Sequence, residues 1–416
     1  MLAIKDLPLE LVECILFSLD PLDVACLAQT CRFFKRLLYS AKHQRLWRGL
    51  YLAQPLDDPR SAVTYLGSPR RDIDWRGELQ KIIRARTVVK NISVCRPEER
   101  CQVLQTLLNM IMNVPPLPHP ESDHISCNVY WVHRLLRDGA FLDHEEWVLT
   151  PEEEQLRACL HVWYGLTQRD GDVEKRLASR AFVYSRRNHT ASNAFGPFMS
   201  DGSMRVNWVH MQALAHVFAL TLVEAEGEED EIAYDVCPIG VSFCQNIIPP
   251  GLTLDVEPDW AGVEGLWTLG YCFLDHREFL SELTCIRIPD NEPLDTSVLE
   301  GADVQEIYSA LTVYFRVTSV EDDPDHPKRP KINYIGEMDG NCTIMGYVKM
   351  TPDNQVWWHW GAGNDGQAVW NCEGIALGGV RSQCGVLGIW STVFHDVEDP
   401  LGTSFILTQP IAWLSD

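Results

Sequence analysis

The sequence lacks closely spaced cysteine pairs of the kind found in metal and redox sites. Its 14 cysteines include no C-x-x-C pair, and no histidine tract has zinc-ligand spacing. Single cysteines lie within apolar segments, as at Cys14, Cys26, Cys159, Cys272 and Cys372. This distribution predicts small buried side chains in a reducing compartment, and no metal site.

The sequence also lacks a secretion leader and a membrane span. Its first eight residues contain no basic region followed by an apolar run. The longest apolar stretch, residues 206–223, contains Asn207, His210, Gln212 and His216, which favours a buried helix over a membrane span. We therefore expect no membrane partner, and a location in the cytoplasm, the nucleus or both.

Basic residues are scarce beyond the first hundred positions. Residues 1–100 carry 17 Lys and Arg against 12 Asp and Glu, whereas the rest of the chain carries 18 against 46. The local balances are therefore +5 and −28, within a formal net charge of −23. So acidic a body lacks the cations that neutralise phosphates, and we expect no nucleic-acid partner.

Familiar catalytic motifs are missing as well. We find no phosphate-binding glycine loop, nucleophile elbow or zincin motif. The polar group best suited to hydrolysis or metal binding is His359, His395, Asp396 and Asp399, since carboxylates near histidines bind cations or relay protons. Their order fits no known ligand spacing. We predict a non-catalytic protein without a cofactor, with an enzyme that uses this group as an alternative.

What the sequence does contain is a change of pattern along its length. Three helical patterns occupy residues 7–39, with Asp20 as a cap and Pro21 at the first position of the second helix. The middle is mainly helical, and Thr150 with Glu153 forms a capping box. From about residue 332, short alternating apolar runs separated by turns predict antiparallel strands.

These patterns together predict an α+β fold in three parts. Residues 1–50 form a three-helix unit, and residues 51–230 form a mainly helical region. Residues 231–416 form a mixed to antiparallel β domain, which we expect to be a sandwich or a small barrel.

The first helix has more apolar surface than so small a unit can bury. One stripe, at four-residue spacing, consists of Leu7, Leu11, Ile15 and Leu19, and a second stripe beside it consists of Val12 and Leu16. Domains below ~40 residues rarely build a core of their own. We therefore expect the second stripe to be buried against another protein.

One dense pattern spans residues 7–47. It reads Leu7-Pro8, Glu10-Leu11, Ile15-Leu16, Leu19-Asp20-Pro21, Asp23, Leu27, Thr30-Cys31-Arg32-Phe33 and Trp47. In this order the segment resembles an F-box, with its L-P-x-E-L, I-L-x-x-L-D-P-x-D, L, V-C-R-x-F and trailing W. Thr30 replaces the usual Val.

The resemblance implies that the segment docks a Skp-type adaptor on a cullin scaffold. The chain would then be the substrate receptor of an SCF-type ubiquitin ligase, with an unknown protein target. The implied adaptor contacts, some of which would serve the module's own packing, are Leu7, Pro8, Leu11, Ile15, Leu16, Pro21, Leu27 and Cys31.

The rest of the chain resembles, more loosely, the bodies of F-box proteins common in basidiomycete fungi. The residues that carry this likeness are Gly196-Pro197-Phe198, Asp201-Gly202-Ser203, Met350-Thr351-Pro352-Asp353, Gly388-Ile389-Trp390, His395-Asp396 and Asp399-Pro400. No substrate class follows from it.

Tryptophans concentrate in the predicted β region, at Trp357, Trp358, Trp360, Trp370 and Trp390. Alternation sends Trp358 and Trp360 to one face of a strand and Trp357 and His359 to the other. One face must be core, and the other is a candidate target or ligand patch because Trp is enriched at binding hot spots. The alternative function is therefore a small-ligand-binding β domain with a sensing or vestigial F-box.

Overall fold

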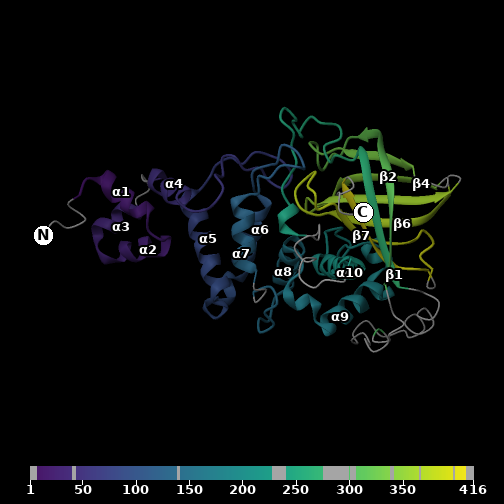
Figure 1. The fold of residues 1–416 in the computed structure, drawn as a ribbon, viewed down its shortest axis with the longest axis horizontal. Coiled ribbons are helices and arrows are strands. Elements are labelled where there is room, and N and C mark those ends of the chain that lie inside the picture. Colours follow the sequence, from purple (N-terminus) through teal and green to yellow (C-terminus); the bar gives the residue numbers. More distant parts are fainter. Residues whose placement is uncertain are drawn as a thin grey trace.

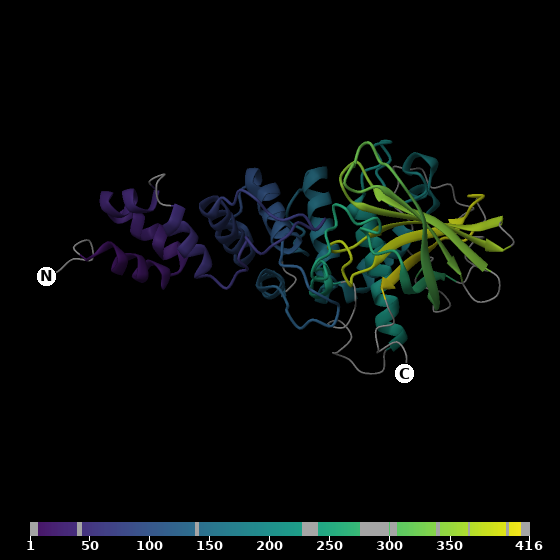
Figure 2. The same cartoon turned by 90° about the horizontal axis from the view of Figure 1, so that it is seen from above.

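The computed structural model describes residues 7–39, 44–137, 141–226, 240–274, 299, 306–337, 342–364, 367–396 and 399–408. Within these residues, a series of helices leads into a ring of strands (Figure 1). The N-terminal helices lie at one end of an elongated molecule and the strands at the other, with the remaining helices between them (Figure 2). The predicted α+β fold is confirmed.

The described helices are α1 (Leu9–Phe17), α2 (Pro21–Thr30), α3 (Arg32–Tyr39), α4 (Gln44–Leu52), α5 (Trp75–Lys90), α6 (Arg100–Met112), α7 (Cys127–Leu136), α8 (Pro151–Tyr164), α9 (Val173–Tyr184) and α10 (Trp208–Glu226). The predicted caps are present: Asp20 Oδ1 accepts from the Leu22 amide at 2.9 Å, and Thr150 and Glu153 form their capping box. A fourth helix, α4, follows the three predicted ones. It is fixed by Trp47, whose indole nitrogen donates to the Leu38 carbonyl at 2.6 Å.

The strands are β1 (Gly265–Leu274), β2 (Glu306–Glu321), β3 (Lys331–Glu337), β4 (Cys342–Met350), β5 (Val356–Asn364), β6 (Gln367–Ala376), β7 (Val386–Thr392) and β8 (Gly402–Thr408). They form a closed antiparallel barrel in chain order, and β8 pairs back onto β1, for example at Leu269 opposite Ile406. The barrel alternative is therefore confirmed. Two strands, β1 and β2, come before residue 332, where the alternating pattern begins in the sequence.

The hydrophobic core has two parts. One lies inside the barrel and includes Trp267, Phe315 and Trp358. The other runs through the helices and onto the outer face of the barrel, where Phe218 of α10 contacts Phe405 of β8 with ring centroids 4.9 Å apart. Helices and barrel thus share one continuous packed interface.

Helix α10 is the buried helix that the long apolar stretch predicts. Its described side chains are almost all buried, including Met211, Leu214 and Phe218. In the described part of the chain, every helix is too short or too polar to cross a membrane.

The five cysteines that the sequence predicts to be buried fall into two groups. Cys159, Cys272 and Cys372 are buried as predicted, whereas Cys14 and Cys26 are exposed on α1 and α2. The prediction was wrong for the last two because each of these short helices turns only one face to the core.

Candidate functional site

The N-terminal helices expose much apolar surface. We define the exposed apolar set as the large hydrophobic side chains of α1, α2 and α3 that are more than a third exposed: Leu9, Leu11, Ile15, Leu22, Phe33 and Tyr39. Single exposed apolar residues are common on proteins, but such a concentration within about thirty residues is typical of a protein-binding surface.

The two stripes of α1 have opposite environments. Val12 and Leu16 are 1% and 0% exposed and pack in the core of the helical unit, whereas Leu11 and Ile15 are 51% and 38% exposed. The expectation that the stripe of Val12 and Leu16 is buried against another protein was therefore wrong. The extra apolar surface is provided instead by the middle of the longer stripe.

The predicted adaptor contacts divide in the same way. Pro8, Leu11, Ile15 and Cys31 are exposed, and Leu7, Pro21 and Leu27 are partly exposed. Leu16 has no exposed surface. It serves internal packing, so we remove it from the proposed contacts.

In the barrel, the tryptophans alternate as the sequence predicts. Trp358 and Trp360 point into the barrel and are buried there. Trp357 points outward, where its indole nitrogen donates to Glu373 Oε2 at 2.7 Å. On the same outer side, His359 Nδ1 lies 2.7 Å from Glu373 Oε1. The inner face of β5 thus belongs to the barrel core, and Trp357 on the outer face is buried in the core shared with the helices.

The described side chains do not fill the barrel interior along its whole length. A cavity of about 230 Å³ lies at the end where β5 finishes and β6 begins, and its walls include Tyr271, Trp360, Trp370 and Trp390. Trp370 is 41% exposed, so it forms part of the rim. Of the five predicted patch residues, the structure brings Trp360, Trp370 and Trp390 together and places Trp357 and Trp358 elsewhere.

The four residues considered for a hydrolytic site do not share one set of partners. His359 pairs with Glu373, as described above. His395 stacks on Phe195 with centroids 3.7 Å apart, and its Nδ1 lies 3.2 Å from Ser391 Oγ. Asp399 accepts from the Asp396 amide at 2.7 Å. The hydrogen bonds of the described residues thus do not gather this group into one catalytic site.

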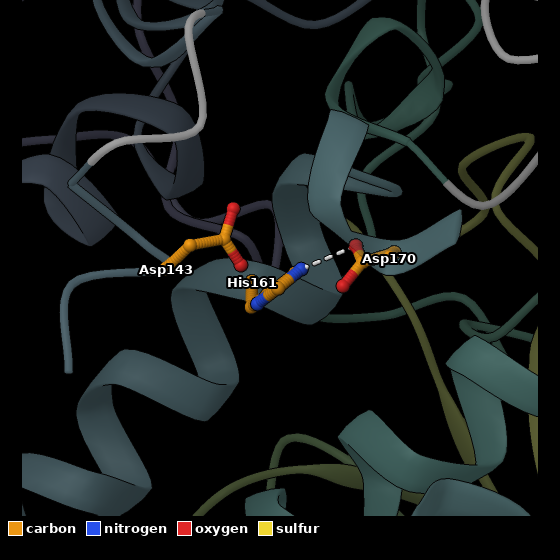
Figure 3. A group of neighbouring side chains, drawn as sticks. All are labelled: Asp143, His161 and Asp170. Carbon is orange, nitrogen blue, oxygen red and sulfur yellow. Dashed lines mark hydrogen bonds and ion pairs between the residues drawn. The ribbon is translucent and has the colours of Figure 1, made fainter. Parts of the chain in front are cut away.

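A different polar cluster is buried beside α8. Figure 3 shows His161 of α8 between Asp143 and Asp170, with a hydrogen bond of 2.8 Å from its Nε2 to Asp170 Oδ2. One atom from each of the three side chains lies within 4.8 Å of the others, close enough to share a cation. Lys175 of α9 supplies a positive charge at this place, because its ammonium pairs with Asp143 and lies 3.8 Å from Asp170 Oδ1.

Asp170 is the centre of this cluster. Burial raises the pKa of its carboxyl group, but His161 and the Thr167 amide outweigh that effect and the net pKa is below the usual value. The Thr167 amide donates to it at 2.6 Å, and His216 contacts its backbone carbonyl at 2.7 Å. We assign the cluster to stabilisation, since an ionised carboxylate this buried depends on all of these partners.

Sequence reasoning missed this cluster. Its members come from the segment before α8, from α8 itself and from the turn after it, so they share no recognisable spacing. His216 is one of the two histidines that the sequence placed in a buried helix, and its partners were not evident there.

Comparison with known proteins adds one match. A family model described as F-box-like matches residues 4–53. No curated protein and no solved structure matches the chain, so the resemblance of the body to fungal F-box proteins stays a prediction. The matched segment contains α1 to α4 and the whole exposed apolar set, and it coincides with the motif read from the sequence. Residues 4–53 of this chain are an F-box-like domain.

Proposed function

We propose that this protein is the substrate-receptor subunit of an SCF-type cullin-RING ubiquitin ligase, and is not itself a catalyst. The observation that carries the proposal is the F-box-like domain at residues 4–53, combined with the exposed apolar set on its helices. Residues 1–50 would bind a Skp-type adaptor and through it a cullin scaffold. The helical region that follows the F-box-like domain, up to residue 230, would act as a spacer, and residues 231–416 would hold a target protein.

The adaptor contacts that we propose are those predicted residues that keep some exposure: Leu7, Pro8, Leu11, Ile15, Pro21, Leu27 and Cys31. Leu11 and Ile15 contribute most, because each has apolar area to bury against a partner and neither is needed for the fold.

The spacer is joined firmly to the F-box-like domain. Arg86 of α5 donates to Asp20 Oδ1 at 2.7 Å, and this hydrogen bond lowers the pKa of Asp20. Tyr51 of α4 packs edge-on against Trp75 of α5, with centroids 5.5 Å apart. A firm connection suits a receptor, because ubiquitin transfer requires the target to be held at a fixed distance from the conjugating enzyme, where its effective concentration is high.

The charge distribution favours a protein as the target. The body carries the net negative charge, which disfavours nucleic acid and anionic membranes as partners.

Co-purification with a Skp-type adaptor tests the proposal. The unmodified chain should retain the adaptor through gel filtration, whereas the double variant Leu11→Asp with Ile15→Asp should lose at least tenfold in affinity. Val148→Asp with Val256→Asp is the matched control, because these side chains are 90% and 79% exposed but lie outside the F-box-like domain. Equal adaptor recovery by all three proteins would exclude the proposed role.

A further inference from the structure

A groove of about 590 Å³ lies between α5 and α7, in the helical region next to the F-box-like domain (Figure 1). Its walls come from residues at three- and four-residue spacing, which places them on one face of each helix. The side chains that matter here are Arg86, Val89 and Lys90 of α5 and Tyr130, Trp131, Arg134 and Leu135 of α7.

The basic side chains of the groove have few acidic neighbours. Arg86 Nη2 pairs with Asp20 Oδ1 at 2.7 Å. Among the described residues, no carboxylate forms an ion pair with Lys90 or Arg134. The Arg134 guanidinium lies over the ring of Tyr130, 5.7 Å from its centroid. Two cations of the groove are therefore left for a partner to neutralise.

This positive charge does not depend on residues 138–140, which follow α7 and lie outside the described residues. They include one charged side chain, Asp138. Even when Asp20 and Asp138 are both counted against the three lining cations, the groove keeps a net charge of +1. The chain after residue 100 carries 18 basic residues against 46 acidic ones, so the groove differs in sign from its surroundings. Electrostatic complementarity then favours an acidic occupant.

The groove also offers apolar surface. Tyr130 is 57% exposed, and Val89, Trp131 and Leu135 are partly exposed. Aromatic side chains beside arginine are enriched where proteins bind one another. An occupant with both carboxylates and an apolar side chain matches these walls, which favours a segment of polypeptide.

The groove meets the exposed apolar set at Asp20. Its Oδ1 accepts from the amide of Leu22 at 2.9 Å and from Arg86 at 2.7 Å. Leu22 is 45% exposed and belongs to the exposed apolar set, whereas Arg86 lines the groove. A protein that covers Leu22 is therefore separated from the groove by one side chain. This continuity favours a single partner for both surfaces.

From these observations, we propose that the partner of the exposed apolar set also places an acidic segment, with at least one apolar side chain, in the groove between α5 and α7. The inference rests on the proposed function, in which that partner is the Skp-type adaptor, and it extends the adaptor interface beyond the F-box-like domain. Carboxylates of the segment contact Lys90 and Arg134, and its apolar side chain packs against Tyr130 and Trp131. The exposed apolar set supplies most of the affinity, whereas the groove speeds association and fixes the adaptor against the helical region.

Adaptor titrations at two salt concentrations test the proposal. Lys90→Glu with Arg134→Glu should raise the Kd roughly five- to twentyfold at 0.1 M salt and less than about twofold at 1 M, because the screening length falls from about 10 Å to about 3 Å. Leu11→Asp with Ile15→Asp should weaken binding at both concentrations. Thermal unfolding checks that each variant is folded.

Arg169→Glu with Arg316→Glu is the matched control. Both arginines are exposed and lie outside the groove, and the variant changes the net charge by the same amount. Its Kd should stay within about twofold of that of the unmodified chain at both salt concentrations.

A cross-linking experiment identifies the occupant. A carbodiimide joins an amine directly to a carboxylate in contact with it, so Lys90 should be linked to an Asp or Glu of the adaptor, and mass spectrometry identifies the linked peptides. Lys90→Arg keeps the charge but has no amine to couple, so it should lose this cross-link and keep the Kd within about twofold. If the double Glu variant does not fold, this conservative variant decides alone.

Four results would overturn the inference and leave the ligase role intact: an unchanged Kd in the groove variant at 0.1 M salt, equal losses in the groove and control variants, no cross-link from Lys90 to the adaptor, or a cross-link from Lys90 to a second copy of this chain alone. Failure of the unmodified chain to bind the adaptor at all would overturn both proposals.

Discussion

Arg180 of α9 and Glu306 of β2 form a bidentate ion pair where the helices meet the barrel. Arg180 Nε donates to Glu306 Oε1 at 2.6 Å, and its Nη2 donates to Oε2. The two residues are 126 positions apart in the sequence. Their side chains are only 9% and 3% exposed. Each charge is therefore compensated mainly by the other, and Arg176 of α9 lies 4.0 Å from Glu306 Oε2 as a second cation.

Removal of either partner from this pair should destabilise the protein by about 3–5 kcal/mol, because the remaining charge stays buried after its bidentate partner is lost. Urea unfolding of Arg180→Met, Glu306→Leu and the double variant measures the effect. The double variant should lose much less than the sum of the two single losses. Additive losses would show that the two side chains are not coupled.

The two stripes of α1 should respond to substitution in opposite ways. Leu16→Ala should cost about 2–5 kcal/mol of stability because it opens a cavity in the core. Leu11→Ala should change stability by less than ~0.5 kcal/mol and weaken adaptor binding. Denaturant unfolding and adaptor titration on both variants check the pair, and the reverse pattern would contradict the assignment of the stripes.

The buried cluster of Asp143, His161 and Asp170 should depend on the charge of Asp170. Asp170→Asn keeps the shape but removes the carboxylate that His161 and the Thr167 amide contact. We expect a loss of about 3 kcal/mol. Asp172→Asn is the matched control, since Asp172 is exposed two residues away and should change stability by less than ~0.5 kcal/mol. Similar losses in both variants would contradict the role of the cluster.

Stability should decrease on acidification below pH 6.5. Burial lowers the pKa of His210 to about 4, and burial together with His395 lowers that of His189 to about 3. Both histidines are therefore neutral in the folded protein while the unfolded chain binds protons from about pH 6.5 downward. Their contribution is complete above pH 6.5 and is lost as the pH falls toward 4 and 3, by up to ~1.4 kcal/mol per pH unit for each histidine.

His210→Leu separates this effect from other acid-sensitive groups. Among the residues that the structure describes, Nε2 of His210 has no hydrogen-bond partner, and the ring packs edge-on against Phe182, so an apolar side chain suits the site. Unfolding free energies measured from pH 4 to 7 should show a shallower slope in the variant than in the unmodified chain. Parallel curves would mean that His210 does not titrate as described.

The sequence predicted features that depend on residues within a single helix or strand. The cap at Asp20, the capping box at Thr150 and the alternation of Trp357 and Trp358 depend on residues a few positions apart, and all three are present in the structure. The F-box-like domain was readable for the same reason, since its motif is local and dense.

The sequence did not predict contacts between helices and strands that are distant in the chain. Strands β1 and β2 precede the segment where alternation is clear, and β2 turns a largely exposed face outward, which weakens its pattern. Which stripe of α1 is internal depends on where α4 packs, and sequence spacing alone does not encode that. The walls of the cavity include Tyr271 of β1 and Ser404 of β8, and these residues meet only when β8 pairs with β1 and closes the barrel.

The closure of the barrel also constrains how the protein is made. Seven of the pairings join strands that follow one another in the chain and can form as each hairpin leaves the ribosome, whereas β1 must wait for β8, more than a hundred residues later. Until then both β1 and β7 present open edges, which invite pairing with other chains. A chain cut before Gly402 would keep its F-box-like domain and lose the strand that seals the sheet. We expect such a product to aggregate while still competing for the adaptor.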